Sequence, residues 1–304
     1  MSGRDPRVLV TGAAGFIGSR LVERLTPAKV VATCHQVPAP GALVFDATSM
    51  SLVDTVLRHH PQLTHAFLLH GISKLETCAR QPVATGRVNV NSMVRMIDEL
   101  TARGVKVVFT SSDAVFDGTR GSWSEEDSPN PVLEYGRQKA AVERHLQQQS
   151  APWIIARLSK VVGLGPGDHN LFGEWIRFID TGVPIRCADD LVFTSIDVDD
   201  VVTGLIELAT GPHAGIFNVC GPRSMTRLEL LHIFLRSVRQ YRDVGNDVIR
   251  CSIRDFPASE VRPLNQSMLP DKAYRTLGRP WESMETVCAR IAAMAYGPQA
   301  AVRA

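Results

Sequence analysis

Tyr135 and Lys139 are the residues of this 304-residue chain whose types and spacing point most directly to chemistry. They occupy positions i and i+4 of the segment YGRQK. A helix brings such positions onto one face, so we expect the Lys139 ammonium beside the Tyr135 phenol. A free phenol has a pKa of about 10, and a neighbouring cation should lower that pKa toward the working range. The pair therefore predicts hydride transfer at a carbonyl, with Tyr135 handling the proton.

A glycine-rich run, TGAAGFIG at residues 11–18, lies far upstream of that pair. It follows a short apolar run and opens a helical apolar stripe over residues 16–25, which is the context that a dinucleotide site requires. Glycines let the backbone approach a pyrophosphate, and the helix N-terminus offers unpaired N–H groups to its charge. An ordinary glycine-rich turn is the alternative. The residues expected to contact a dinucleotide here are Gly12, Ala14, Gly15, Phe16, Ile17 and Gly18.

The ends of the next three predicted strands supply further candidate cofactor contacts. The second strand ends near His35 without the acidic residue that would hold an adenosine ribose 2′-OH, which favours NADPH and leaves NADH open. His35 is equally explained as a solvated strand-end histidine. Asp46, followed by Ala47, is either an adenine contact or a plain turn aspartate. The fourth strand closes at Leu69, His70 and Gly71, where the backbone should pass close to the cofactor ribose, and His70 needs no catalytic role.

Two polar residues complete the candidate catalytic set. The fifth strand ends in TSSD at residues 110–113, and a hydroxyl at such a strand end points into the crevice where open α/β sheets bind ligands. Ser112 could therefore donate a hydrogen bond to a substrate carbonyl oxygen and stabilise the charge developing there. Asn89 lies in a long predicted helix, residues 83–103, and could hold a water or backbone group that steadies Lys139. A solvated helix asparagine is the alternative.

Short apolar runs alternate with helical patterns along the first half of the chain. Such runs are typical of strands buried on both faces of a parallel sheet. We expect strands at 8–10, 30–32, 43–45, 66–69, 105–109, 154–156 and 216–219, and later helices at 171–181, 227–238 and 283–295. The predicted fold is α/β, a Rossmann-type doubly wound parallel sheet with a smaller C-terminal substrate-binding lobe. Its NAD(P)-binding domain would comprise residues 1–162 and about 196–221, the lobe residues 163–195 and 222–297, and a frayed tail residues 298–304.

Composition and charge exclude several classes of protein. The net charge is +2, from 33 basic and 31 acidic residues, which gives no electrostatic case for nucleic acid or membrane as a partner. Six scattered cysteines without metal-ligand spacing predict free thiols and no metal. The N-terminus has no apolar signal region, and no run approaches the ~20 apolar residues of a membrane span, so a cytoplasmic location is expected.

Several motifs resemble one family within the extended short-chain dehydrogenase/reductase superfamily. The segment SSDAVFDG at residues 111–118 resembles the S-T-D-Y-V-F-D-G of dTDP-4-dehydrorhamnose reductases. YGRQK falls where that family has Y-G-x-x-K, and the later segments RLSKVVG and RPLNQSML are weaker matches. The resemblance runs from about residue 8 to residue 295.

This resemblance implies a Ser112–Tyr135–Lys139 catalytic set. Reduced nicotinamide would deliver hydride to C4 of a 4-keto-6-deoxy sugar on a nucleoside diphosphate. Two positions depart from the family: Ala114 stands where it has tyrosine, and Lys160 where it has a substrate-facing tryptophan. Both changes remove aromatic surface that would pack on the sugar. Lys160 either meets a phosphate or carboxylate or lies at the pocket rim. The candidate substrate contacts are Ser112, Asp113, Lys160, Asn170 and Arg262.

Two other functions stay open at this point. An epimerase of the same superfamily would keep NAD bound through its cycle. A dehydratase needs an Asp-Glu pair after the hydroxyl residue, whereas Asp113 is followed by Ala114. The regulatory subunit of methionine adenosyltransferase also resembles this family, so a non-catalytic nucleotide-binding subunit is the third hypothesis. A nucleotide sugar is the expected small-molecule partner, and the oligomeric state is open, with a homodimer the commonest case.

Overall fold

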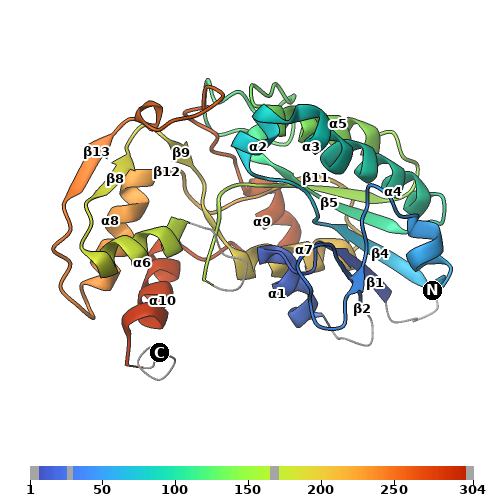
Figure 1. Cartoon of the computed structure of the whole chain (residues 1–304), viewed down its shortest axis with the longest axis horizontal. Helices are drawn as coiled ribbons and strands as arrows, with labels where there is room; N and C mark the ends of the chain where they lie inside the picture. The colour runs from blue at the N-terminus through green and yellow to red at the C-terminus, as the bar shows by residue number, and fades with distance from the viewer. Residues whose placement is uncertain (1–6, 26–29, 165–170, 299–304) are drawn as a thin grey trace. The chain divides into compact units, whose positions relative to one another are not determined.

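A computed structural model describes residues 7–25, 30–164 and 171–298 of the chain. The chain forms two compact units (Figure 1). The first contains the described residues up to Phe116, together with Ser128–Leu158 and Val202–Phe217. The second contains Asp117–Asp127, Ser159–Val201 and the described residues from Asn218 onward. The predicted domain boundaries stay a prediction.

A seven-stranded sheet organises the first unit, in the order β11-β6-β5-β4-β1-β2-β3. The pairs β1–β2, β2–β3, β1–β4, β4–β5 and β5–β6 are all parallel. The strand order reverses direction between β1 and β4, and open α/β sheets bind ligands beyond the carboxyl ends of the strands at such a point. The strands are β1 Arg7–Thr11, β2 Val30–Cys34, β3 Leu43–Val44, β4 Leu63–Leu68, β5 Lys106–Ser112, β6 Trp153–Leu158 and β11 Gly215–Val219.

Apolar runs place the inner strands in a core, which confirms the predicted doubly wound α/β sheet. Leu9, Phe109 and Ile155 are each 0 % exposed and belong to one cluster with apolar residues of α4 and α5. Figure 1 shows α4 and α5 on one face of the sheet and α1 on the other. The helical segments here are α1 Phe16–Arg24, η2 Val53–Leu57, α2 Leu75–Arg80, α3 Pro82–Gly86, η3 Arg87–Asn91, α4 Ser92–Thr101, the 3-10 turn η4 Asp113–Val115, and α5 Glu134–Leu146.

Two sequence expectations for this unit need correction. The third strand is only Leu43–Val44, and both of its side chains are exposed, because β3 is the last strand at one edge of the sheet. The long helix expected over residues 83–103 is divided into α3, η3 and α4. Its middle part, η3, is a π-helical turn, and such turns occur often at functional sites. Asn89 lies within η3 and is buried.

The second unit has its own core, built around three aromatic rings. The ring centroids of Phe172 and Phe234 are 4.9 Å apart, and those of Phe172 and Trp175 are 5.5 Å apart. The expected helices at 171–181 and 227–238 are confirmed as α6 Leu171–Thr181 and α8 Arg227–Val238. Also in this part of the chain are β7 Val161–Val162, β8 Ile185–Ala188, β9 Val192–Phe193, β10 Ile196–Asp197, α7 Val198–Thr210, β12 Met225–Thr226, β13 Val248–Cys251, η5 Ile253–Asp255, α9 Asp271–Leu277 and α10 Met284–Tyr296. Of the predicted frayed tail, residues 299–304 lie outside the described residues.

Candidate active site

The glycine turn connects β1 to α1, and its geometry favours glycine at two positions, Gly12 and Gly18. Gly12 has φ of 70°, a conformation that favours glycine. A Cβ on Gly18 would lie 2.1 Å from the carbonyl oxygen of Gly12, so α1 packs directly against the turn. Gly15 is the N-cap of α1, whose first turn carries no acidic side chain. The turn and the helix N-terminus can therefore accept an anionic group, as a pyrophosphate requires.

A threonine–histidine contact joins this turn to the end of β4. Oγ1 of Thr11 accepts a hydrogen bond from the Leu69 N–H at 3.0 Å, and Nδ1 of His70 lies 2.9 Å from the same oxygen. Nε2 of His70 lies 3.1 Å from Oγ of Ser92 in α4. Burial lowers the pKa of His70 to about 4, with the Lys139 charge adding to the effect. His70 is thus neutral near pH 7 and connects β1, the end of β4 and α4.

The candidate contacts after β2 and β3 lie close together. Nε2 of His35 is 4.0 Å from Oδ2 of Asp46, and the His35 side chain is 57 % exposed. The Asp46 carboxylate accepts hydrogen bonds from the N–H and hydroxyl of Thr48 and from the Ser49 hydroxyl. These bonds lower the pKa of Asp46 to about 2. Asp46 therefore builds the turn after β3, while its adenine contact and the roles of His35 and Ala47 stay predictions.

Tyr135 and Lys139 lie on one face of α5, as their spacing predicts. Nζ of Lys139 is 5.7 Å from the centroid of the Tyr135 ring and 4.7 Å from that of Phe109. The ammonium donates a hydrogen bond of 2.7 Å to the carbonyl oxygen of Thr110 in β5. Lys139 is only 7 % exposed, and burial lowers its pKa to about 8. A cation is thus held beside the phenol and against the carboxyl end of a central strand.

The pKa of Tyr135 shifts in the direction opposite to the sequence expectation. The spacing of Tyr135 and Lys139 predicts that the ammonium lowers it. Burial instead raises the pKa of the Tyr135 phenol, and the Asp113 carboxylate adds to the rise. The ammonium lies 5.7 Å from the ring centroid, and desolvation of the phenolate sets the direction of the shift. The phenol is therefore fully protonated at neutral pH, which suits a residue that gives a proton away.

Ser112 ends β5 next to the start of α5. Its hydroxyl donates a hydrogen bond of 2.9 Å to Oδ1 of Asp113 and accepts one of 3.2 Å from the N–H of Ala114. The bond from the Ala114 N–H caps η4. The start of α5 packs against this turn, since a Cβ on Gly136 would lie 1.9 Å from the Ala114 carbonyl oxygen. Glycine at position 136 thus brings α5 close to Ser112. Donation by Ser112 to a substrate stays a prediction.

Asn89 is buried, and the hydrogen bonds of its side chain go to Ile72, Cys78 and Gln138. Its Oδ1 accepts from the Ile72 N–H at 2.7 Å, and its Nδ2 donates to the Ile72 carbonyl oxygen at 2.9 Å. Nδ2 also donates to Oε1 of Gln138 at 2.7 Å. A Cβ on Gly71 would lie 3.1 Å from Oδ1 of Asn89. Asn89 therefore links the loop after β4, at Ile72, to α5, at Gln138, which precedes Lys139 in the sequence.

Lys160 and Arg262, two further candidate substrate residues, belong to the second unit. Lys160 is exposed, and its carbonyl oxygen accepts a hydrogen bond of 3.1 Å from the Ile196 N–H. Arg262 is partly buried and lines a cavity of about 820 Å³ formed by residues 253–262. Asn170 lies outside the described residues. The roles of these three residues stay predictions.

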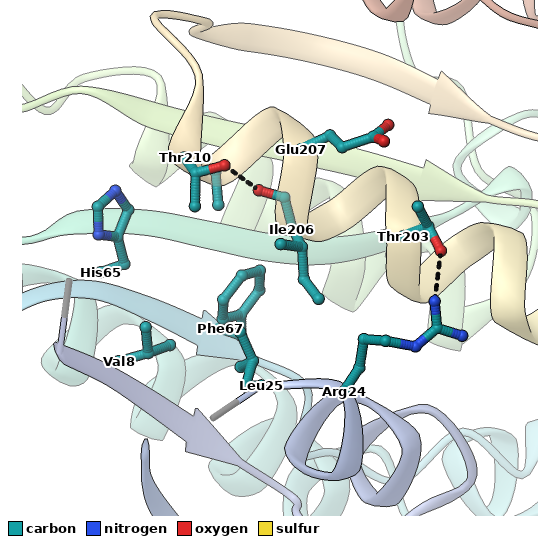
Figure 2. A pocket seen from close by; sticks show the side chains of 10 residues that line it. Val8, Arg24, Leu25, His65, Phe67, Thr203, Ile206, Glu207 and Thr210 are labelled. Carbon is teal, nitrogen blue, oxygen red and sulfur yellow. Dashed lines mark hydrogen bonds between the residues drawn. The ribbon is translucent and has the colours of Figure 1, made fainter. Parts of the chain in front are cut away.

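A second cavity, of about 380 Å³, lies in the first unit (Figure 2). Figure 2 shows Arg24 of α1 reaching the hydroxyl of Thr203 in α7, a hydrogen bond of 3.3 Å. The cavity lies among the start of β1, β4, the end of α1 and α7. It is lined by Val8, Arg24, Leu25, His65, Phe67, Thr203, Ile206, Glu207, Ala209 and Thr210. None of these lining residues is among the candidates that the sequence singles out.

A buried ion pair that the sequence patterns did not predict lies one helical turn after Lys139. Arg157 of β6 and Glu143 of α5 pair at 2.8 Å, with side chains 1 % and 0 % exposed. Glu143 stands four residues after Lys139, so continuing the Tyr135–Lys139 helix face by one turn would have found it. The pairing of Glu143 with a residue of the next strand could not be predicted from that spacing.

Over residues 7–25, 30–164 and 171–298, no group of three or more His, Cys, Asp or Glu side chains could hold a metal ion. None of the helices within these ranges has the length and hydropathy needed to cross a membrane. All six cysteines are free thiols, as expected, and all but Cys251 are buried.

Comparison with known proteins finds several that are similar to this chain. It is 28 % identical to methionine adenosyltransferase 2 subunit beta of Rattus norvegicus, covering 86 % of this chain and 76 % of that protein. It is 23 % identical to dTDP-4-dehydrorhamnose reductase of Sinorhizobium fredii, covering 90 % and 92 %. An uncharacterized protein of the same bacterium, y4nG, is 26 % identical over 75 % of this chain, and the match spans 59 % of that protein.

Solved structures confirm the fold. The crystal structure of dTDP-4-dehydrorhamnose reductase from Bacillus anthracis in complex with NADP superimposes with a TM-score of 0.82, at 22 % identity, over 95 % of this chain and 99 % of that one. The model of one family, the RmlD substrate binding domain, matches residues 6–295. That match spans nearly the whole chain and confirms the resemblance seen in its motifs. The chain belongs to the RmlD substrate-binding domain family.

Proposed function

We propose that the protein is an NAD(P)H-dependent reductase of a 4-keto (deoxy)sugar nucleotide or a related ketone, with Tyr135 as proton donor. The observation that carries the proposal is the Lys139 ammonium, buried 5.7 Å from the centroid of the Tyr135 ring at the carboxyl end of β5. Membership of the RmlD substrate-binding domain family supports the substrate class, as does the similarity to dTDP-4-dehydrorhamnose reductase over 90 % of the chain.

The residues around the glycine turn fit a dinucleotide cofactor. A Cβ at Gly18 would collide with the Gly12 carbonyl oxygen, and Gly12 itself has a positive φ and lies close to the backbone of His70. Glycine at these positions lets the backbone of the turn approach a pyrophosphate. The N–H groups at the start of α1 would bind its charge. The end of β2 carries His35 in place of an acidic residue, which favours NADPH. When bound, the reduced nicotinamide supplies the hydride.

The proton then comes from α5. Because burial raises the pKa of Tyr135, its phenol is protonated and can donate to the carbonyl oxygen as negative charge develops there. The phenolate that results is stabilised by the Lys139 ammonium beside the ring. Ser112 would turn its hydroxyl from Asp113 toward the substrate oxygen and stabilise the same charge.

The test is to mix the purified protein with NADPH and a panel of nucleoside-diphosphate 4-keto sugars and to follow the loss of NADPH absorbance. The proposal expects oxidation of NADPH by at least one member of the panel, and none by the corresponding 4-hydroxy sugars. Failure of every 4-keto sugar would count against it. Tightly retained NAD in the purified protein, with interconversion of epimers and no net oxidation, would identify an epimerase.

A non-catalytic regulatory subunit is the second candidate function. The observation that favours it is the 28 % identity to methionine adenosyltransferase 2 subunit beta over 86 % of the chain. The changed substrate-contacting positions, Ala114 and Lys160, are compatible with this function. Recovery of a stoichiometric protein partner from cells, together with a Tyr135→Phe strain that behaves as wild type, would support it. A Tyr135→Phe strain that behaves as a deletion would favour the reductase.

A further inference from the structure

A buried ion pair lies one helical turn beyond Lys139 on α5. Nε of Arg157 donates to the two carboxylate oxygens of Glu143 at 3.1 and 3.3 Å, and Nη2 donates to Oε2 at 2.8 Å. The Arg157 guanidinium also lies 5.1 Å from the centroid of the Phe116 ring. Taking two charges out of water is expensive, and a buried pair often adds little net stability. Because Glu143 of this pair lies on the helix that carries the proposed proton donor, we considered a role in the site rather than in stability.

Glu143 shares a helix face with the proposed proton pair. Tyr135, Lys139 and Glu143 follow one another at intervals of four residues, so a phenol, an ammonium and a carboxylate lie in sequence along α5. The hydrogen bond from Nζ of Lys139 goes to a neutral carbonyl group, which supplies no negative charge. Burial lowers the pKa of Lys139, and the Glu143 carboxylate opposes that fall.

We propose that Glu143, held in place by Arg157, is a positioning residue that keeps the Lys139 ammonium protonated beside Tyr135. The bonds from Arg157 fix the carboxylate in the protein interior, where its charge acts on Lys139 with little screening by solvent. Glu143 acts through Lys139 and has no contact with substrate in this scheme. The inference rests on the proposed function for its catalytic meaning, because Lys139 matters to catalysis only if Tyr135 gives up a proton.

Other titratable groups face Lys139 from the surrounding elements. His70, after β4, is neutral near pH 7 because burial lowers its pKa to about 4. The Cys78 thiol of α2 raises the pKa of Lys139, by less than Glu143 does. Tyr135 is protonated, and the Asp113 carboxylate acts on Tyr135. Among the described residues, Glu143 is therefore the charge that acts most strongly on Lys139.

The test is an NMR titration of the lysine ammonium groups in ¹⁵N-lysine-labelled protein, with Lys139 assigned by the loss of its signal in Lys139→Arg. Wild-type Lys139 should titrate near pH 8. In Glu143→Gln its midpoint should fall by on the order of one pH unit, since a nearby opposite charge shifts a pKa by about that amount or more. If wild type is active, the alkaline limb of its pH–rate profile should move by the same amount.

Glu143→Gln leaves the Arg157 charge buried without its partner and could fail to fold. The double variant Glu143→Leu/Arg157→Met removes both charges, a replacement that folded proteins often tolerate. Glu143 acts on the pKa of Lys139 more strongly than Arg157 does, so the Lys139 midpoint should fall in the double variant as well. The matched control is Asp98→Asn, which removes a carboxylate that lies 2.7 Å from Nε2 of His145 on the surface of α5. Its Lys139 midpoint should equal that of wild type.

An unchanged Lys139 midpoint in the folded double variant would overturn the inference and leave Glu143 and Arg157 as a structural pair. This outcome is separable from failure of the proposed function. If none of the ketones tested causes the wild-type protein to oxidise NADPH, the reductase proposal fails. The NMR titration still decides whether Glu143 controls the charge of Lys139.

Discussion

The carbonyl oxygen of Thr110 accepts a hydrogen bond of 2.7 Å from the ammonium of Lys139, which fastens the proposed proton pair of α5 to the carboxyl end of β5. Because β5 pairs with β4, and β4 with β1, this bond relates Lys139 to the strand that leads into the glycine turn. The helix with the proposed proton donor and the turn with the proposed cofactor residues are therefore attached to strands of one sheet.

Replacing Tyr135 by phenylalanine removes the proposed proton donor and leaves the ring. We expect kcat to fall by about 10²–10⁴, the usual contribution of a positioned general acid, with little change in NADPH affinity. Steady-state kinetics and a fluorescence titration with NADPH measure the two quantities. Tyr241→Phe, at a tyrosine that is 40 % exposed in the second unit, is the control and should behave as wild type. Wild-type turnover in Tyr135→Phe would remove the mechanism.

A methyl group at position 18 should disrupt the glycine turn. The Cβ of Gly18→Ala would lie 2.1 Å from the Gly12 carbonyl oxygen, so α1 must move away from the turn. We expect the Kd for NADPH to rise at least about tenfold, equivalent to ~1.4 kcal/mol, together with a lower Tm. Gly173→Ala in α6 is the matched control, because its Cβ would meet nothing within 4 Å. That change should stabilise the helix by about 0.5–1 kcal/mol. Equal NADPH affinity in both variants would contradict the proposed cofactor site.

His70 should make the protein sensitive to acid. Its pKa falls from 6.5 to about 4 on folding. Between these values the unfolded state binds more protons, so stability rises with pH through this window and is lost as the pH falls. His70→Gln removes this dependence. The difference in unfolding free energy between wild type and His70→Gln should therefore shrink by on the order of 2 kcal/mol from pH 6.5 to pH 4.

Urea denaturation at several pH values measures that difference. His232→Gln, at an exposed histidine of α8, controls for the loss of a histidine elsewhere. A difference between wild type and His70→Gln that stays constant over the window would show that His70 titrates normally in the folded protein.

Asn89 should matter for stability more than its neighbour Asn91. Asn89→Ala removes the acceptor of the Ile72 N–H and the donor to Oε1 of Gln138, while the Ile72 carbonyl oxygen keeps the hydrogen bond from the Cys78 thiol. A buried polar group left unpaired costs about 1–3 kcal/mol, so we expect a loss of at least that size in urea denaturation. Asn91→Ala, at an exposed residue of the same π turn, should cost less than about 0.5 kcal/mol. Equal losses in the two variants would contradict the proposed link from Ile72 to α5.

Local patterns predicted much of the fold. The apolar runs at β1, β2, β4, β5 and β6 identified the strands, and helical periodicity gave α6 and α8 with their observed bounds. The glycine turn could be predicted because its spacing reflects a steric requirement between nearby residues: a Cβ at Gly18 meets the backbone of Gly12. The spacing of Tyr135 and Lys139 predicted their shared helix face for a similar reason.

Features that depend on burial or on distant contacts could not be predicted in this way. The exposure of β3 follows from its position at the sheet edge, which an apolar triplet does not reveal. The rise in the pKa of Tyr135 comes from desolvation and from Asp113, and spacing along α5 reveals neither. The bond from Ser112 to Asp113 depends on the turn that follows β5. The Arg157–Glu143 pair joins β6 to α5, and neither the apolar run of the strand nor the periodicity of the helix shows that these two residues meet.

Isotope transfer tests directly whether NADPH gives its hydride to a carbonyl carbon with the help of Tyr135. NADPH carrying deuterium at both C4 positions should be mixed with wild-type protein and the 4-keto sugar nucleotide that oxidises it, and the product examined by mass spectrometry and NMR. We expect one deuterium bound to the former carbonyl carbon, transferred at a rate that Tyr135→Phe reduces by about 10²–10⁴. A product without deuterium at that carbon, or equal rates in the two proteins, would contradict hydride transfer assisted by Tyr135.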